Sequence, residues 1–383
     1  MDFALTDEQK LLQHSLERLL ADHYSFAARQ RYAREPRGWS LELWKRYAEL
    51  GLLGLPFDEQ YGGSGGGPVE TMIVMELIGR ALVLEPYFAT VVLGGSLVRL
   101  GGREDMRAAI LPKIAAGKLL LAFAHSERQS RYDLADVAAS ARRDGSGYVL
   151  DGAKSLVIHG DTAEKFVVSA RLSGGQRDRG GIGLFLVDAA VPGVSVRGYA
   201  TVDELRAAEV TLTNVRVADS AVIGEPGAAF PLIERTFDGA IAALCAEAVG
   251  ALEAMQETTV DYMKTRKQFG VTIGSFQVLQ HRAADMLVAL EQARSMAMLA
   301  TMMAAADDVR ERRAAISAAK AQIGRSGRSV GQAAIQIHGG IGMTMEAKVG
   351  HYFKRLTVID TLFGDTDYHL GLLAESGGLF AAV

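Results

Sequence analysis

The chain has 383 residues, a length that accommodates two or three packed units. Apolar residues make up 49% and charged residues 22%, which is typical of a globular protein and excludes a mostly disordered chain. Lys and Arg number 41 against 45 Asp and Glu, so no overall positive field exists to hold nucleic acid or an anionic membrane. The single cysteine, Cys245, excludes an intramolecular disulfide and a cysteine-based zinc cluster.

The N-terminal sequence MDFALTDEQK is polar and acidic, unlike a signal or transit peptide. The longest apolar runs in the chain fall well short of a membrane span. Together these features predict a cytoplasmic protein without a metal centre or a membrane partner.

The first segment, residues 1–118, has a helical pattern. Leucines from Leu5 onward recur every three or four residues, and Thr6 is placed to cap this amphipathic helix. A second helix is predicted over residues 41–53. The GGSGGGP stretch that follows lacks a preceding strand and the Lys-Ser/Thr of a phosphate-binding loop, so we expect a loop that opens a helix at Val69.

The spacing of apolar residues changes in the second segment, residues 119–228. Stretches such as GYVLDGAKSLVIHG, GIGLFLVD and AEVTLTNVRV are short, β-rich and bounded by Gly, Asp or Asn, which predicts an antiparallel sheet or barrel. The third segment, residues 229–383, is rich in Ala and Met and has no proline after Pro231. This pattern favours long helices buried in a bundle or between subunits.

Three motifs in this α+β chain resemble the acyl-CoA dehydrogenase family. They are ELGLLGLPFDEQYGGSGGG at 49–67, RKQFG followed by IGSFQ within 266–277, and IQIHGGIGMT at 335–344. The resemblance covers essentially the whole chain. It implies an N-terminal helical domain, a middle β-barrel domain, a C-terminal four-helix bundle, FAD as cofactor and acyl-CoA as substrate. Within that family, the sequence is most similar to small subunits of the pimeloyl-CoA dehydrogenase type. This narrower resemblance rests on general similarity, including AALCAEAVG and LFGDTDYHL.

The retained motifs suit the adenosine and pyrophosphate end of FAD. A guanidinium supplies several donors to a pyrophosphate, and glycines let the backbone approach a dinucleotide. Spacing alone favours a solvated helix end for RKQFG, but the resemblance favours FAD contacts, made mainly to the cofactor of a neighbouring subunit. It therefore implies a dimer or tetramer. The expected FAD contacts are Arg266, Gln268, Phe269, Phe276, Gln277, Gln336, Gly339, Gly340, Ser126 and Thr366.

The flavin-ring end departs from the family pattern. The family's Thr-Glu-Pro-x-x-Gly-Ser-Asp stretch falls on residues 126–133, where Ser126 and Asp133 keep the hydroxyl and the acid but the Pro, Gly and Ser are lost. The flavin-facing Thr is replaced by Ile158, which cannot form hydrogen bonds, and the preceding aromatic residue is replaced by Leu156. We therefore expect this subunit to bind the isoalloxazine ring poorly.

The catalytic base is also missing at both family positions. Removal of the α-proton of a thioester requires a carboxylate beside the α-carbon, and the resemblance places that Glu at Gly364 or Ala240. Asp365 follows the first position and is either a base or a helix cap. Glu247 shares a helix face with Ala240 but lies about 10.5 Å further along the axis, where a buried, partnered acid is the alternative.

The three histidines nearest these motifs, His125, His159 and His338, are interpreted as packing or cap residues rather than bases. The resemblance then implies a supporting small subunit of a heterotetramer. A homologous large subunit would hold the flavin ring and the base, and an electron-transferring flavoprotein would accept the electrons. Two alternatives remain: a self-sufficient homo-oligomer that uses Asp365 or Glu247 as base, and a structural paralogue without FAD.

Overall fold

The computed structural model describes residues 4–377, whose contacts divide the chain into two units. The first, which we call the helical unit, comprises the described parts of Met1–Arg31, Pro68–Val83 and Ile241–Val383. The second, which we call the sheet unit, comprises Tyr32–Gly67 and Leu84–Ala240. The N-terminal helical segment thus contributes elements to both units.

The helical unit begins with α1 (Asp7–His23) and α2 (Phe26–Tyr32). Thr6 caps α1 as predicted: its hydroxyl accepts from the Gln9 backbone N–H at 3.2 Å, and the Gln9 side chain accepts from the Thr6 N–H at 3.0 Å. The GGSGGGP stretch precedes α4 (Pro68–Ala81), which confirms the predicted loop and helix start to within one residue.

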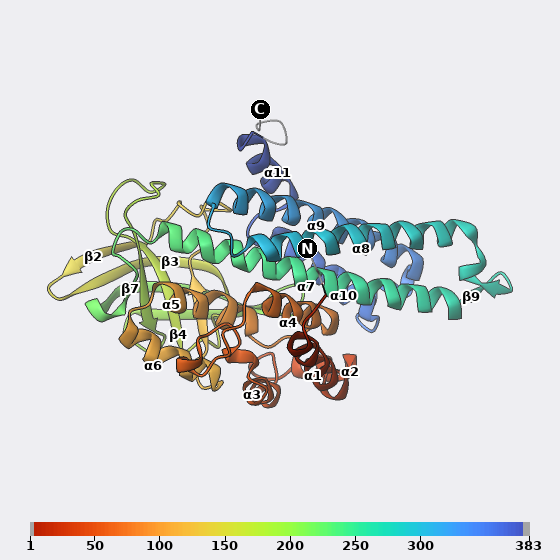
Figure 1. Cartoon of the computed structure of the whole chain (residues 1–383), viewed down its shortest axis with the longest axis horizontal. Coiled ribbons are helices and arrows are strands. Elements are labelled where there is room, and N and C mark those ends of the chain that lie inside the picture. Colours follow the sequence, from red (N-terminus) through yellow and green to blue (C-terminus); the bar gives the residue numbers. More distant parts are fainter. Residues whose placement is uncertain (1–3, 378–383) are drawn as a thin grey trace. The chain divides into compact units, whose positions relative to one another are not determined.

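Long helices form the C-terminal part, as predicted. They are α7 (Phe230–Thr265), α8 (Gln277–Met303), α9 (Val309–His338), α10 (Lys348–Thr361) and α11 (Thr366–Glu375). Within the helical unit, α9 packs against α8, α10 and α11. A hairpin of β9 (Lys267–Gln268) and β10 (Val271–Thr272) connects α7 to α8 at their shared end (Figure 1).

Glycines allow α4 and α7 to touch through their backbones. A β-carbon at Gly79 would lie 1.8 Å from the Glu247 carbonyl oxygen, and one at Gly250 would lie 1.8 Å from that of Glu76. No side chain fits in such a gap, so these two positions fix the close crossing of the helices.

In the sheet unit, α3 (Leu41–Glu49) is shorter than the predicted helix over 41–53. Gly51 has φ +75°, a left-handed conformation that ends the helix, and a 3₁₀ turn over Leu52–Gly54 follows. The other helical elements of this unit include 3₁₀ turns (Glu59–Tyr61 and Asp219–Ala221), a π-helix (Phe88–Gly95), α5 (Ser96–Gly101) and α6 (Glu104–Ala115).

A β-sheet forms the middle of the chain, which confirms the predicted β domain. Its strands are β1 (Leu121–Ala124), β2 (Ser140–Asp144), β3 (Gly147–Ile158), β4 (Lys165–Arg171), β5 (Ile182–Asp188), β6 (Val194–Ala200), β7 (Arg206–Ala218) and β8 (Val222–Ile223). Neighbours follow the order β6-β7-β3-β2-β4-β5-β8, and β1 pairs in parallel with β4. The β3–β7 ladder is interrupted between Lys154 and Val157, where Leu156 takes a left-handed φ of +51°.

The core of the sheet unit is built from alternating apolar side chains of β3, β4, β5 and β7, among them Leu150, Phe166, Phe185 and Val210. Among residues 4–377, no helix is both long enough and apolar enough to cross a membrane.

Candidate functional site

Two motifs that are far apart in sequence meet at one end of the helical unit. Tyr262, in the last turn of α7, stacks on His338, the last residue of α9, with ring centroids 4.4 Å apart and planes at 22°. The Tyr262 hydroxyl also donates to the His338 carbonyl at 3.4 Å. The RKQFG hairpin after α7 and the glycine turn after α9 are therefore neighbours. The predicted packing role of His338 is confirmed, and burial lowers the pKa of its imidazole.

The hairpin projects Phe269 into solvent. Phe269 and Gly270 are the two loop residues between β9 and β10, and both have positive φ, +55° and +83°, as a type I′ turn requires. The Phe269 side chain is 92% exposed, and its ring lies edge-on to Phe276 at 6.2 Å. The edge contact with Phe276 therefore leaves most of the Phe269 ring surface open to solvent.

The surroundings of this ring suit a dinucleotide. Arg266 is exposed and its guanidinium has no hydrogen-bond or ion-pair partner in the described part of the chain. A β-carbon at Gly339 or Gly340 would meet no atom within 4 Å, so a ligand can approach the backbone there. A free cation, an exposed ring and accessible backbone are the groups that pyrophosphate and adenosine need, and this end fits that half of FAD.

The other predicted contacts divide into two groups. Gln277 begins α8 beside the hairpin, Gln336 is exposed in the last turn of α9, and the Gln268 amide donates to the Lys267 carbonyl at 2.8 Å. Thr366 lies apart from them, buried at the start of α11, where its hydroxyl donates to Asp360 at 2.9 Å. Its hydroxyl is therefore engaged within the protein.

The segments that would face a flavin ring are adjacent in the sheet unit. The Ser155 N–H donates to the Ser126 carbonyl at 2.9 Å, which joins the Ser126 loop to the end of β3. Leu156 is exposed there and Ile158 is half-buried. These aliphatic side chains offer neither a hydrogen bond nor an aromatic face, so this end fits the isoalloxazine ring poorly.

A buried polar network beneath this segment was not foreseen from the sequence. Lys154 donates to Glu127 at 2.7 Å, to the Ser169 hydroxyl at 3.0 Å and to the His125 carbonyl at 3.1 Å. Burial lowers the pKa of Lys154 to about 8 and that of His125 to about 3. Glu127 lies in the 126–133 stretch and Lys154 lies two residues before Leu156, so the available signal was a pair of opposite charges beside the altered flavin-ring segments. The His125 ring stacks against Phe123, which confirms its packing role.

The first family position for the base is closed. Gly364 is buried with φ +113°, and a β-carbon there would lie 2.5 Å from Tyr368 Cδ1 and 2.6 Å from His369 Nε2. Lys320 holds this turn by donating to the carbonyls of Gly364 at 2.6 Å and Asp360 at 2.8 Å. No carboxylate can occupy position 364 in this arrangement.

The two remaining acids are both engaged. Asp365 caps α11, where its carboxylate accepts from the Tyr368 backbone N–H at 2.9 Å, as the cap alternative predicted. Glu247 accepts from Arg355 Nε at 2.5 Å and from a terminal nitrogen at 2.7 Å, and the side chains are only 5% and 7% exposed. Glu247 is thus the buried, partnered acid of the second alternative. A catalytic role for either acid stays a prediction.

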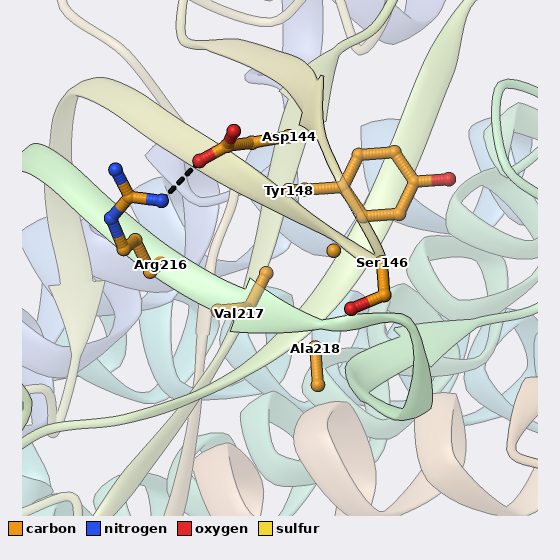
Figure 2. A pocket seen from close by; sticks show the side chains of 7 residues that line it. Asp144, Ser146, Tyr148, Arg216, Val217 and Ala218 are labelled. Atoms are coloured by element: carbon orange, nitrogen blue, oxygen red, sulfur yellow. Dashed lines mark hydrogen bonds and ion pairs between the residues drawn. The ribbon is translucent and has the colours of Figure 1, made fainter.

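A polar hollow of about 250 Å³ lies at the other end of β3. Figure 2 shows Asp144 and Arg216 paired across its rim, and the Tyr148 hydroxyl accepts from Arg143 at 2.8 Å. Gly147 and Tyr148 open β3, whereas Leu156 is near its end, roughly 25–30 Å away along the strand. The hollow is therefore separate from the flavin-facing segment, and its charged groups already have partners.

Comparison with known proteins agrees with this geometry. Family models for the N-terminal, middle and C-terminal domains of acyl-CoA dehydrogenases match residues 6–118, 122–215 and 229–378. The chain belongs to the acyl-CoA dehydrogenase family. It is an oxidoreductase of the class that acts on CH–CH bonds, and FAD is the cofactor of that family. The general resemblance predicted from the sequence is confirmed, whereas the narrower one to a pimeloyl-CoA dehydrogenase small subunit has no such support.

Several relatives cover most of the chain. FadE12, an acyl-CoA dehydrogenase of Mycobacterium tuberculosis, is 32% identical over 311 residues, which are 80% of this chain and 79% of that protein. YngJ of Bacillus subtilis, a probable acyl-CoA dehydrogenase, is 29% identical and covers 98% of this chain and 99% of its own length.

Two solved structures are similar over nearly their whole lengths. The Tcur3481-Tcur3483 steroid acyl-CoA dehydrogenase variant has a TM-score of 0.87 at 28% identity and covers 97% of both chains. The FAD complex of PigA has a TM-score of 0.89 at 26% identity and covers 99% of this chain and 100% of that one.

Proposed function

We propose that this chain is the supporting subunit of an FAD-dependent acyl-CoA dehydrogenase that introduces an α,β double bond into an acyl-CoA. A homologous partner subunit would hold the flavin ring and supply the base. One contrast carries the proposal: the dinucleotide end offers an exposed aromatic ring and accessible backbone, whereas the base position at Gly364 is closed by His369 and Tyr368.

The chain's own residues then act on the cofactor across a subunit interface. Arg266 would donate charge-assisted hydrogen bonds to the pyrophosphate, and Phe269 would cover an apolar face of the adenosine. Gly339 and Gly340 would let backbone approach the dinucleotide. The flavin, when bound, supplies the acceptor for the hydride that leaves the β-carbon. The α-proton would go to a carboxylate of the partner, because the family positions 240 and 364 carry none.

A two-component assembly has support from one structural relative, whose printed name joins two gene products, Tcur3481 and Tcur3483, in a steroid acyl-CoA dehydrogenase. A steroid-type acyl group and a dicarboxylyl group such as pimeloyl are both compatible with this assignment. We propose an electron-transferring flavoprotein as the electron acceptor and retain the cytoplasm as the expected compartment.

The two rival functions are less well supported. A self-sufficient homo-oligomer would need Asp365 or Glu247 as base, yet the first is a helix cap and the second is held by Arg355. A structural paralogue without FAD would have no use for Arg266, which has no side-chain partner among residues 4–377, or for the exposed Phe269 near it.

Flavin content decides among these functions. The chain would be purified alone and after co-expression with a homologous chain that carries the family Glu. We expect a colourless protein alone, and a yellow complex with acyl-CoA dehydrogenase activity after co-expression. A yellow, active protein alone would establish the homo-oligomer. A complex that never retains flavin would establish the structural paralogue.

Sedimentation should also show a dimer or larger species, and a stable 41.0 kDa monomer at micromolar concentration would contradict assembly.

A further inference from the structure

The glycine turn that would approach FAD has little packing of its own. It follows α9 as a 3₁₀ turn over Gly339–Met343, in which Gly339 has a positive φ of +64°. A β-carbon at Gly339 or Gly340 would meet no atom within 4 Å, so nothing in the described part of the chain packs against that side of the turn. Glycine also has more backbone freedom than any other residue. The shape of the turn therefore depends on contacts at its two ends.

His338 anchors the start of the turn. Its ring stacks on Tyr262, and its Nδ1 donates to the Ala334 carbonyl at 2.9 Å within α9. Gly342 packs against the same residue, because a β-carbon there would lie 3.0 Å from His338 Cβ. The direction in which the chain enters the turn is therefore fixed by contacts within the helical unit.

Two donors from different helices meet where the chain leaves the turn. The Met345 carbonyl accepts from His351 Nε2 of α10 at 3.0 Å and from Gln30 Nε2 of α2 at 3.2 Å. Because a carbonyl oxygen only accepts, Nε2 is the nitrogen of His351 that carries a proton here. Gly350 brings α10 close to the same segment, since a β-carbon there would lie 3.1 Å from the Gly342 carbonyl oxygen. The backbone after the turn is therefore held by both α10 and α2.

The His351 ring is itself oriented by α2. It is buried, and the Phe26 ring lies edge-on to it with centroids 5.0 Å apart. A terminal nitrogen of Arg29 lies 3.5 Å from His351 Nδ1, and Arg29 Nε donates to the Leu82 carbonyl at 2.8 Å. A guanidinium only donates, so Nδ1 is the acceptor nitrogen of the ring and Nε2 keeps its proton toward Met345. These contacts fix the orientation in which His351 donates to the Met345 carbonyl.

We propose that His351 is a positioning residue for FAD: by holding the Met345 carbonyl, it fixes the glycine turn in the shape that receives the dinucleotide. A turn that is ordered before binding loses less conformational freedom on binding, so it binds more tightly. Gln30 assists as the second donor to the same carbonyl, which connects α2 to the turn across 315 positions. The inference rests on the proposed function, because FAD must reach this turn. It assigns part of the cofactor affinity to a buried histidine and to the N-terminal helix that orients it.

Titration of the flavin-free assembled complex with FAD, followed by flavin fluorescence, tests the proposal. His351→Leu removes the donor and should weaken FAD binding roughly tenfold, the effect of one lost hydrogen bond. His351→Gln should stay within about threefold of wild type, because its side-chain amide can donate to the same carbonyl. Gln30→Glu replaces the second donor by a group that cannot donate, at a half-buried position of α2. It should weaken FAD binding less than His351→Leu, and it decides the question if His351→Leu fails to assemble.

A general loss of stability would also lower FAD affinity, so it needs its own control. Ile316→Ala truncates a buried side chain of α9, about 33 Å along the helix from His338, and should leave FAD affinity within about twofold. Hydrogen exchange of residues 339–347 reports the order of the turn directly. Exchange there should be faster in His351→Leu than in wild type, and near the wild-type rate in His351→Gln and Ile316→Ala.

The two measurements together separate the outcomes. Weaker FAD binding with faster exchange of the turn in His351→Leu, and recovery of both in His351→Gln, supports the positioning role. Equal FAD affinity of His351→Leu and wild type overturns it, and so does an equal loss of affinity in Ile316→Ala. Weaker binding without faster exchange also overturns it, because His351 would then act elsewhere. A wild-type complex that binds no FAD overturns the proposed function and this inference with it.

Discussion

Glu247 on α7 and Arg355 on α10 form a buried ion pair with two hydrogen bonds, of 2.5 and 2.7 Å. The pair lies where α7 meets α4, because the Glu247 carbonyl is the atom against which Gly79 packs. Glu247 lies two helix turns after Ala240, the family's alternative base position. It therefore links α4, α7 and α10 within one unit.

Removing one partner of this pair should destabilise the protein. Glu247→Gln removes the carboxylate charge that faces the buried Arg355 guanidinium, and we expect a loss of about 3–5 kcal/mol of unfolding free energy in urea titrations. The double variant Glu247→Leu/Arg355→Met should recover most of this loss, because an apolar pair needs no solvation. A Glu247→Gln protein as stable as wild type, with its dehydrogenase activity abolished, would instead identify Glu247 as the base.

Asp365→Asn should leave turnover of the complex within about tenfold of wild type, since removal of a general base costs roughly 10²–10⁴-fold. Asn is as good a helix cap as Asp, so this variant keeps the bond to the Tyr368 N–H and should be as stable as wild type. Asp365→Ala, which loses the cap, should cost about 1 kcal/mol. A large fall in turnover of Asp365→Asn at unchanged flavin content would overturn the supporting-subunit assignment.

Gly364→Glu should not restore a base. Its β-carbon would collide with Tyr368 and His369, and the φ of +113° is unfavourable for any side chain. We expect a loss of about 2 kcal/mol or more of unfolding free energy and no gain in activity of the chain alone. Gly364→Ala is the matched control and should lose stability for the same reason. Dehydrogenase activity gained by a stable Gly364→Glu protein would show that the turn can open.

Arg266→Ala should weaken FAD retention in the assembled protein, because a charge-assisted contact contributes roughly 1.5–3 kcal/mol. Phe269→Ala should add to this loss through the missing ring surface. Flavin content would be measured after gel filtration. Lys267→Ala, which removes the adjacent exposed cation, is the control and should retain flavin. Unchanged flavin in both Arg266→Ala and Phe269→Ala would refute the assigned contacts.

Stability should fall on acidification. Burial, with Lys320 nearby, lowers the pKa of His369 to about 4, while an unfolded histidine titrates near about 6.5. Below about pH 6.5 the unfolded state therefore binds the extra proton. The stabilisation is complete above that pH and is lost as the pH falls toward 4, by about 3 kcal/mol in total.

The variant His369→Asn should flatten this acid limb in pH-dependent unfolding experiments. The slope should shrink rather than vanish, because His125, whose pKa burial lowers to about 3, contributes in the same direction. An identical pH dependence in wild type and His369→Asn would show that His369 is not responsible.

Much of the architecture followed from local sequence. Leucine spacing and Thr6 located the first helix, and the change to short β-rich stretches located the sheet. The loss of the family Glu was visible at Gly364 and Ala240 as single residues. These features depend on neighbours within a few positions, so periodicity and motif spacing suffice to detect them. The predicted helix over 41–53 was too long at its C-terminal end, because the left-handed conformation of Gly51 ends α3.

Which residues far apart in the sequence contact each other was decided by the tertiary structure alone. The stack of Tyr262 on His338 brings the RKQFG hairpin and the glycine turn after α9 together across 76 positions, and Arg355 meets Glu247 across 108. The sequence indicated that Glu247 is a buried acid, but it could not say which cation neutralises it. Local patterns determine which face of a helix is buried, whereas the identity of the partner depends on how separate helices pack, and that is decided only when the whole unit folds.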